Sequence, residues 1–195
     1  RVPLSIDTYK AEVARETLAA GASIVNDVSG LLYEPRLATV VADTGAPLIL
    51  MHTRGRSREM YREASYRDVA GEVVVELEQQ IQVAVEAGVA REQLVVDPGI
   101  GFAKKAEHSY AVLAALERLT SLDRPVLVGP SRKSFLASDS DAGPEQREWG
   151  TAAAVAAGVL AGAHVVRVHQ PGAMRQVVDV ADRLLAASEA GGGLA

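Results

Sequence analysis

The chain has 195 residues, of which 48% are hydrophobic and 23% are charged, with no cysteine and a formal net charge of −5 at pH 7. This composition is typical of one globular domain and excludes a disordered chain, a disulfide scaffold and a membrane protein, whose spans need about 18 or more consecutive apolar residues. The acidic balance argues against a general nucleic-acid binder, because nonspecific affinity for phosphate backbones comes mostly from Lys and Arg.

Short apolar segments alternate with longer amphipathic segments along the whole chain, which predicts a parallel sheet with crossover helices. The apolar segments, rich in Val, Ile and Leu, are the predicted strands: residues 4–8, 23–28, 47–52, 94–97, 125–129 and 164–169. The segments that follow them are the predicted helices: residues 10–20, 35–44, 66–87, 106–121, 145–161 and 172–188. Glycines just beyond four of the helices predict left-handed helix ends at Gly21, Gly45, Gly88 and Gly162.

No linker divides these six units, so we expect one domain over residues 1–189 and a flexible tail over residues 190–195. Two α/β architectures remain open. A doubly wound open sheet uses five or six strands, whereas a (β/α)8 barrel needs eight units and typically about 250 residues. The number of units alone favours the open sheet.

Polar residues end all six predicted strands, although the strand interiors are almost wholly apolar. In chain order these ends carry Asp7-Thr8, Asn26-Asp27, Met51-His52, Asp97, Ser131-Arg132-Lys133-Ser134, and Arg167 with His169. In both architectures function is expected beyond the C-terminal ends of the strands. An open sheet would spread six ends over more than about 20 Å, because strands lie about 4.8 Å apart. A barrel brings them to one pocket, so the polar strand ends favour the barrel.

Taken singly, each of these residues has an ordinary structural explanation. The explanations are helix caps for Asp7 and Asp97, a turn for Asn26 and Asp27, a buried structural role for His52, a solvated pair for Arg132 and Lys133, and core packing for Met51 and Phe102. Their coincidence at six strand ends favours a shared site instead.

The charges at the strand ends differ in sign along the chain. Arg132, Lys133, Arg167 and His169 end the last two strands, where a barrel commonly binds phosphate. The earlier strands carry Asp7, Asn26 and Asp97, whose oxygen atoms can accept hydrogen bonds from an amino-bearing heterocycle. We therefore predict a ligand with a polar ring and an anionic tail. The motifs of dinucleotide, P-loop, zinc-protease and α/β-hydrolase sites are absent from the sequence.

Six segments in this order resemble the dihydropteroate synthase family, (β/α)8-barrel enzymes of folate biosynthesis. They are Ser5-Ile-Asp-Thr, Ile24-Val-Asn-Asp-Val, Leu50-Met-His, Asp97-Pro-Gly-Ile-Gly-Phe, Val128-Gly-Pro-Ser-Arg-Lys-Ser-Phe and Val166-Arg-Val-His. The resemblance extends to about residue 187. It implies a transferase that condenses dihydropterin methyl pyrophosphate with p-aminobenzoate to give dihydropteroate and pyrophosphate.

The resemblance also implies roles for individual residues. Lys133, Asp97 and Asp7 would be catalytic. Asp97, Asn26 and Lys133 would hold the pterin ring, with Asp7 beside it and with Met51 and Gly129 lining the slot. Arg167 and His169 would bind the pyrophosphate. The p-aminobenzoate would face Ser134 and Phe102. The family mechanism resembles SN1 chemistry, in which pyrophosphate departs before the aromatic amine attacks.

The chain departs from the family pattern at its N-terminal end. The two βα units that precede the Ser5-Ile-Asp-Thr strand in the family are absent, so we expect a (β/α)8 barrel without its first two units and with two unpaired strand edges. One missing loop carries the Asn that ligates Mg²⁺ together with the pyrophosphate, so Mg²⁺ is the expected cofactor and this chain is expected to supply no metal ligand. Ala103 and Gln170 replace a usual Gly and Asp.

Two alternative functions remain open on the sequence alone. A methyltetrahydrofolate methyltransferase shares the barrel and the Asp and Asn positions, but it has no anionic leaving group for Arg167 and His169 to bind. A non-catalytic pterin-binding protein would account for the missing loops. The expected partners are the two small-molecule substrates and a second copy of the chain in a homodimer, with no nucleic acid and no membrane. The composition and the N-terminus predict a cytoplasmic protein.

Overall fold

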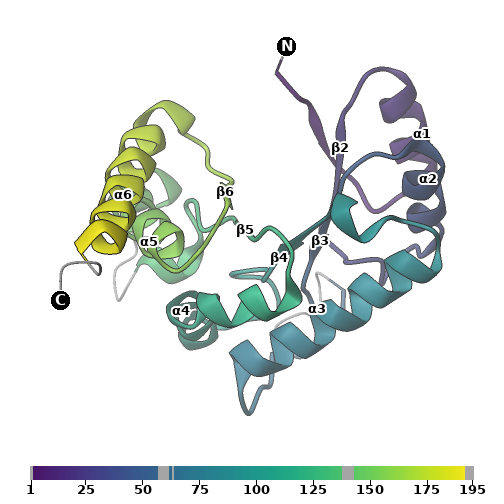
Figure 1. The fold of residues 1–195 in the computed structure, drawn as a ribbon. Helices are drawn as coiled ribbons and strands as arrows, with labels where there is room; N and C mark the ends of the chain where they lie inside the picture. The colour runs from purple at the N-terminus through teal and green to yellow at the C-terminus, as the bar shows by residue number, and fades with distance from the viewer. Residues whose placement is uncertain (1, 57–61, 63, 138–142, 192–195) are drawn as a thin grey trace.

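The computed structural model describes residues 2–56, 62, 64–137 and 143–191. Six strands alternate with six α-helices (Figure 1). The strands are β1 (Ser5–Asp7), β2 (Ile24–Asp27), β3 (Leu48–Met51), β4 (Leu94–Asp97), β5 (Leu127–Val128) and β6 (Val165–Val166). The α-helices are α1 (Ala11–Ala19), α2 (Arg36–Thr44), α3 (Val69–Glu86), α4 (Ala106–Ala114), α5 (Glu148–Leu160) and α6 (Pro171–Gly191). Most of the predicted tail lies outside the described residues, and its first two residues belong to α6.

Short 3₁₀ helices account for the main differences from the predicted elements. They are η1 (Arg91–Gln93), η2 (Leu116–Leu122), η3 (Ser134–Ala137) and η4 (Pro144–Arg147). The helix predicted over residues 106–121 is therefore wrong in its second half, where α4 gives way to η2. The buried residues of η2 are Leu116, Leu119 and Leu122. This spacing of three matches the three residues per turn of a 3₁₀ helix, so the tighter helix keeps all three leucines on one buried edge.

The strands are parallel and their order in space follows the order in the chain. One sheet has the order β1-β2-β3-β4, a second pairs β5 with β6, and a bridge between Val96 and Val126 connects the two. This order differs from the reversal that defines a doubly wound sheet. The chain is thus an α/β protein whose strands form a sequential arc with helices on its outer side (Figure 1).

The core lies between the arc of strands and the helices. Val73, Leu77, Ile81 and Ala84 of α3 recur at helical spacing and are fully buried. A smaller cluster joins α5 to α6 through Val155, Val159, Met174 and Ala181, so the Ala-rich faces of these two helices pack on each other within the chain. Leu160, Val180 and Leu184 remain exposed beside this cluster.

The predicted left-handed helix ends are confirmed. Gly21, Gly45, Gly88 and Gly162 have φ angles of 109°, 70°, 99° and 97°. Each ends a helix and turns the chain back towards the next strand, which after Gly88 is reached through η1.

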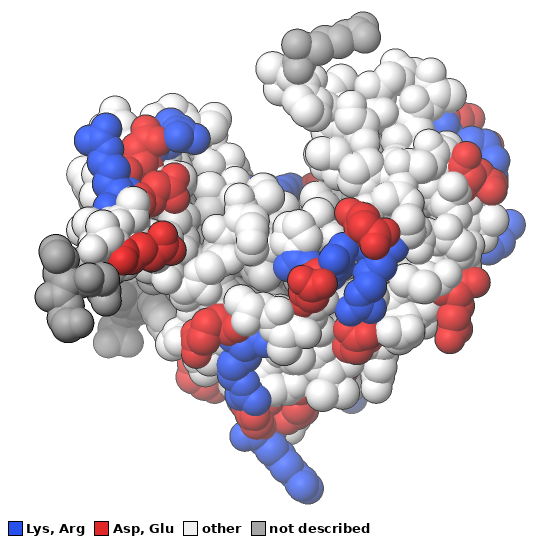
Figure 2. Space-filling view, viewed as in Figure 1, with Lys and Arg blue, Asp and Glu red and all other residues white. Residues whose placement is uncertain are grey.

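The surface carries mixed charge. On the face shown in Figure 2, the described Lys and Arg side chains lie among Asp and Glu rather than in one extended basic patch. Within the described part of the chain, no helix combines the length and the apolar character that crossing a membrane requires.

Candidate active site

Residues from the ends of all six strands meet around a cavity of about 110 Å³. The residues that line it are Asp7, Asn26, Val28, Met51, Asp97, Gly99, Ile100, Phe102, Gly129, Lys133 and Arg167. Of the ten residues predicted to bind substrate, eight line this cavity, and Ser134 and His169 do not. The parallel sheet explains the convergence, because the C-terminal ends of all its strands point in one direction.

Asp7 connects the first strand of the arc to the last. Asn26 Nδ2 donates a hydrogen bond of 2.8 Å to Asp7 Oδ1, and Arg167 Nη2 lies 2.5 Å from Asp7 Oδ2. The ion pair between Asp7 and Arg167 therefore joins the end of β1 to the end of β6 across the mouth of the cavity. Asn26 Oδ1 is buried and has no hydrogen-bond partner among the described residues. A buried acceptor of this kind is costly unless a ligand supplies the missing donor.

Asp97 presents a nearly buried carboxyl group to the cavity, with 7% of the residue exposed. Its Oδ1 accepts a hydrogen bond of 2.7 Å from the backbone N–H of Gly99. Burial raises the pKa of Asp97 to about 6, although the Gly99 hydrogen bond and the positive charges of Lys133, Lys104 and Arg167 act to lower it. At neutral pH this carboxylate can accept hydrogen bonds from a ligand that reaches it.

Lys133 brings a positive charge to the lining of the cavity. Its Nζ lies 3.6 Å from the centroid of the Phe102 ring, a cation–π contact. Burial lowers the pKa of Lys133 to about 8, while Asp97 acts to raise it. No hydrogen bond or ion pair joins Lys133 Nζ to a described side chain, so its three donors can point to a ligand.

The other polar residues after β5 and β6 lie outside the cavity. Arg132 does not line it and pairs with Glu145 at 2.8 Å and with Glu148 at 3.3 Å, so two carboxylates already accompany its charge. The exposed His169 places Nδ1 2.8 Å from the buried Ser131 Oγ. Ser134 lies exposed in η3.

Two residues considered at the strand ends have structural roles. Asp27 is buried and accepts hydrogen bonds from the backbone N–H groups of Ser29 and Leu31, as a turn residue does. His52 is fully buried and lies between Glu76 Oε2, at 3.0 Å from Nε2, and Lys104 Nζ, at 2.8 Å from Nδ1. The turn explanation for Asp27 and the structural explanation for His52 are therefore confirmed.

Sequence reasoning missed five residues at or behind the cavity: Val28, Gly99, Ile100, Lys104 and Glu76. Val28, Gly99 and Ile100 lie in the segments at the C-terminal ends of the strands, so the position of those segments could have identified them. Lys104 and Glu76 had no such signal, because lysine and glutamate on amphipathic segments are ordinarily solvated.

Gly99 allows the chain after Asp97 to pass close to β3. Its φ is +65°, and a Cβ atom there would lie 1.9 Å from the carbonyl oxygen of His52. We expect Gly99→Ala to lower the free energy of unfolding by about 3 kcal/mol or more, because the left-handed conformation costs about 1–2 kcal/mol and the clash adds to it. Urea denaturation measures this loss.

Gly45→Ala is the matched control for Gly99→Ala. Its φ is +70°, but the nearest atom to an added Cβ is 3.8 Å away, on the side chain of Gln93. This variant should lose only the conformational part, about 1–2 kcal/mol. Equal losses in the two variants would show that the close approach to His52 is not a constraint.

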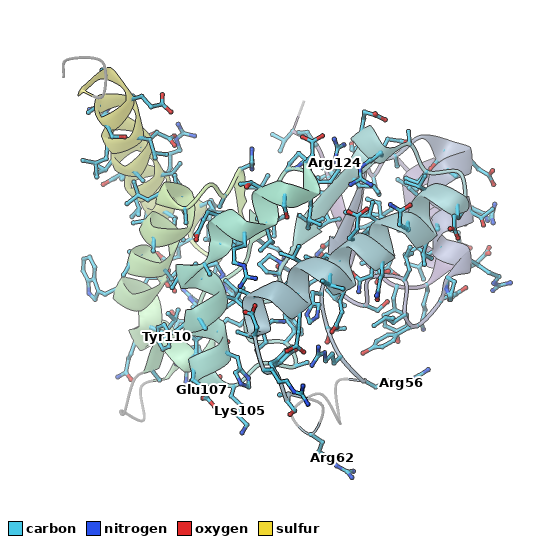
Figure 3. All side chains as sticks on the ribbon, turned by 60° about the horizontal axis from the view of Figure 1, so that its bottom comes forward. Arg56, Arg62, Lys105, Glu107, Tyr110 and Arg124 are labelled. Carbon is cyan, nitrogen blue, oxygen red and sulfur yellow. The ribbon has the colours of Figure 1, made fainter. Side chains whose placement is uncertain are left out.

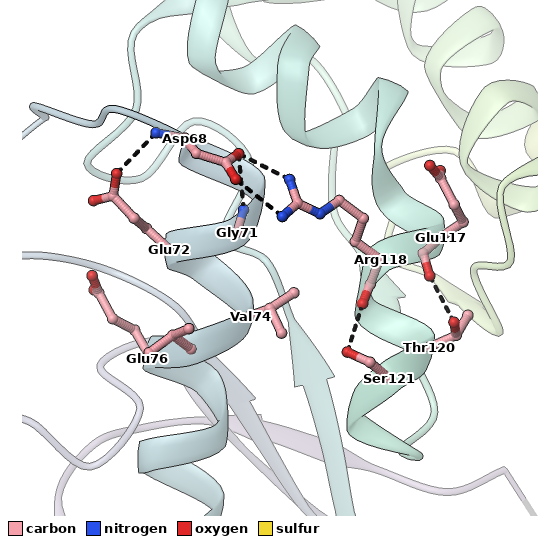
Figure 4. A pocket seen from close by; sticks show the side chains of 10 residues that line it. Asp68, Gly71, Glu72, Val74, Glu76, Glu117, Arg118, Thr120 and Ser121 are labelled. Atoms are coloured by element: carbon pink, nitrogen blue, oxygen red, sulfur yellow. Dashed lines mark hydrogen bonds and ion pairs between the residues drawn. The ribbon is translucent and has the colours of Figure 1, made fainter.

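A larger cavity of about 720 Å³ lies elsewhere, between α3 and η2 (Figure 4). Asp68 and Arg118 face each other there in a two-bonded ion pair of 2.9 and 3.0 Å. Asp68 also accepts a hydrogen bond from the backbone N–H of Gly71. Because these charged groups satisfy one another, this cavity offers no convergent set of unpaired groups, and the smaller cavity at the strand ends is the candidate active site.

The described residues contain no group of three or more His, Cys, Asp or Glu side chains that could hold a metal ion. Asp7, the exposed carboxylate nearest the mouth, is already paired with Asn26 and Arg167. These residues do not form a magnesium site by themselves.

The chain matches known proteins over most of its length. The profile of the family described as pterin binding enzyme matches residues 1–169. The dihydropteroate synthase of Synechocystis sp. is 47% identical over 184 residues, which are 94% of this chain and 64% of that protein. The chain therefore spans less than two thirds of that relative.

Solved structures agree with the sequence match. The Yersinia pestis dihydropteroate synthase in a sulfonamide drug complex has a TM-score of 0.91 and 35% identity, over 96% of this chain and 68% of that one. The Xanthomonas albilineans dihydropteroate synthase in complex with 7,8-dihydropteroate has a TM-score of 0.87 and 38% identity, over 95% and 68% of the two chains. By profile, by identity and by fold, the chain belongs to the dihydropteroate synthase family of pterin binding enzymes.

Proposed function

We propose that the protein carrying this chain is a dihydropteroate synthase, which condenses dihydropterin methyl pyrophosphate with p-aminobenzoate. The observation that carries the proposal is one cavity lined by Asn26, whose buried Oδ1 has no partner among the described residues, by the buried Asp97 and by Lys133. A pterin ring offers amino and ring N–H donors along one edge and a carbonyl oxygen beside them. Two acceptors and one cationic donor match that edge.

Binding would place the ring in the slot and the pyrophosphate at its mouth. The Asp97 carboxylate and Asn26 Oδ1 accept hydrogen bonds from the ring, and Lys133 donates to it. Arg167, whose side chain is 57% exposed, and the exposed His169 lie at the end of the last strand, where they can meet the anionic tail. Arg167 would exchange its contact with Asp7 for a charge-assisted contact with a phosphate oxygen.

The reaction needs charge stabilisation more than proton transfer. The C–O bond between the pterin methylene and the pyrophosphate breaks, and its electron pair leaves with the pyrophosphate. The amine nitrogen of p-aminobenzoate then forms the new C–N bond and loses one proton to solvent. Arg167 and His169 stabilise the departing anion, while the Asp97 carboxylate stabilises the positive charge that develops on the ring.

The pH dependence of kcat/KM should be bell-shaped. Asp97 must be ionised, and its pKa of about 6 places the acid limb there, since the carboxyl is neutral below that pH. Lys133 must be charged, and its pKa of about 8 places the basic limb there. Activity should therefore be highest between about pH 6 and pH 8. A rate that keeps rising above pH 9 would contradict the role of Lys133.

We also propose that the strand arc is six eighths of a (β/α)8 barrel. The sequential parallel order of the strands and the ion pair between the ends of β1 and β6 support this, as do TM-scores of 0.91 and 0.87 to dihydropteroate synthases. Mg²⁺ as a cofactor, a homodimer and a cytoplasmic location remain predictions. The exposed apolar residues Leu160, Val180 and Leu184 on α5 and α6 support the homodimer.

One assay separates this function from its alternatives. The protein is incubated with dihydropterin methyl pyrophosphate, p-aminobenzoate and Mg²⁺, and dihydropteroate and pyrophosphate are measured by chromatography. Equal amounts of both products support the proposal. Pterin binding without product would favour a non-catalytic pterin-binding protein, and methyl transfer in a parallel incubation with methyltetrahydrofolate would favour a methyltransferase.

A further inference from the structure

Lys104 is the largest almost fully buried side chain among the described residues, with 2% of its surface exposed. Burying an ammonium group is costly unless other groups replace its water, so such a residue needs an explanation. It does not line the cavity at the strand ends. It lies behind that cavity, in the segment that follows Phe102.

The Lys104 ammonium is held by two acceptors. Nζ lies 2.8 Å from His52 Nδ1 and donates to the carbonyl oxygen of Phe102 at 3.2 Å. Because an ammonium group can only donate, His52 Nδ1 accepts, which leaves the ring proton on Nε2 to be donated to Glu76 Oε2 at 3.0 Å. Arg54 in turn donates from Nε to both oxygens of Glu76 at 3.1 Å. A continuous set of contacts therefore runs from α3 to the loop after β4.

The loop that Lys104 holds has an unusual backbone. Gly99, Gly101 and Ala103 all have left-handed φ angles, of 65°, 77° and 47°. Ala103 carries a Cβ, so its conformation is strained and persists only where the surroundings hold it. Besides the contact of Lys104 with Phe102, the hydroxyl of Tyr66 donates to the carbonyl oxygen of Ala103 at 2.9 Å.

We propose that Lys104 is a positioning residue for the candidate pterin site. Its ammonium, held on His52 and on the carbonyl oxygen of Phe102, fixes the loop after β4 and places a second positive charge behind Asp97. The loop carries the Phe102 ring that contacts Lys133. Lys104 thus acts on both Phe102 and Asp97 without touching the ligand. The role in ligand binding rests on the proposed function, whereas the effect on Asp97 does not.

The charges around the two residues set the direction of the effect. Asp97 faces Lys133, Lys104 and Arg167, and each of them lowers its pKa against the larger effect of burial. Lys104 faces Asp97 and Glu76, which favour its charged form, and Arg54 and Lys133, which oppose it. Burial is the largest influence on Lys104 and lowers its pKa to about 7. Without the Lys104 charge, the pKa of Asp97 rises further, so less of the carboxylate is present at neutral pH.

The test compares Lys104→Met with Lys105→Met. Lys105 is exposed and projects away from the body of the protein (Figure 3), so it controls for the loss of a neighbouring positive charge at the surface. The Asp97 carboxyl carbon is titrated by ¹³C NMR in the free proteins. Its pKa should rise clearly above the wild-type value in Lys104→Met and stay unchanged in Lys105→Met.

The second measurement is the affinity for dihydropterin methyl pyrophosphate by calorimetry. At pH 6.5 the Lys104→Met variant should bind about threefold more weakly than Lys105→Met, because a rise of one unit from a pKa of about 6 lowers the ionised fraction of Asp97 from about three quarters to about one quarter. The difference in affinity between the two variants should become smaller towards pH 8, where Asp97 is ionised in both. A purely structural role would lower the affinity equally at both pH values.

An unchanged Asp97 titration in a folded Lys104→Met variant would overturn the proposal. If that variant does not fold, the wild-type chain decides: the Lys104 ammonium protons should exchange slowly with water and show hydrogen-bond coupling to His52 Nδ1, and fast exchange would overturn the proposal. A shifted Asp97 titration in a protein that binds no dihydropterin methyl pyrophosphate would support the effect of Lys104 on Asp97 and overturn the proposed function.

Discussion

Asp97→Asn should lower kcat/KM for dihydropterin methyl pyrophosphate by 100-fold or more, which corresponds to about 2.7–4 kcal/mol of transition-state stabilisation. The amide keeps the size of the carboxyl and its oxygen can still accept from Gly99 N. Its NH₂ group, however, presents donors where the ring also presents donors, and the negative charge that stabilises the ring is lost. Steady-state kinetics with p-aminobenzoate at saturation measures the effect.

Asp123→Asn is the matched control for Asp97→Asn. The Asp123 side chain is 95% exposed, and its left-handed φ of 50° is one that Asn adopts readily. The control should keep kcat/KM within twofold of wild type. A loss of less than tenfold in Asp97→Asn would remove Asp97 from the mechanism.

Lys133→Met should also lower kcat/KM by 100-fold or more, and it should remove the basic limb of the pH profile near pH 8. Methionine keeps an apolar contact with the Phe102 ring but supplies neither charge nor donor, so the ring carbonyl loses its cationic partner. The pH–rate profile between pH 5 and pH 10 measures both effects.

Lys105→Met controls for Lys133→Met, since it removes an exposed lysine of the same chemistry. It should leave the rate and both limbs unchanged. A Lys133→Met variant that keeps its basic limb near pH 8 would show that another group titrates there.

The α/β class and the position of the cavity were predictable from the sequence because they depend on local patterns. β3 and β4 are continuous apolar runs, and parallel strands place their C-terminal ends together. Asp97 and Asn26 follow from position alone: each lies at or next to the end of such a strand, and both are nearly buried.

Neighbouring residues with the same chemistry could not be separated in this way. Arg132 and Lys133 are adjacent and both basic, yet Arg132 pairs with Glu145 and Glu148 while Lys133 lines the cavity. The difference follows from the tertiary turn after β5, where Arg132 has a φ of +59°. Composition and spacing carry no signal for such a turn at a residue other than glycine.

Buried charge was likewise beyond sequence reasoning. Lys104 and Glu76 are 28 positions apart and meet only through His52. Each is unremarkable in its own segment, and their burial depends on how α3 packs behind the end of β3.

The most direct test of the central claim is a calorimetric titration of this chain with dihydropterin methyl pyrophosphate, without p-aminobenzoate. If the strand ends form a pterin pyrophosphate site, one molecule should bind per chain, and Asp97→Asn should weaken that binding by at least tenfold while pyrophosphate alone binds much more weakly. Binding that is equally strong for pyrophosphate alone, or that is unaffected by Asp97→Asn, would contradict the account.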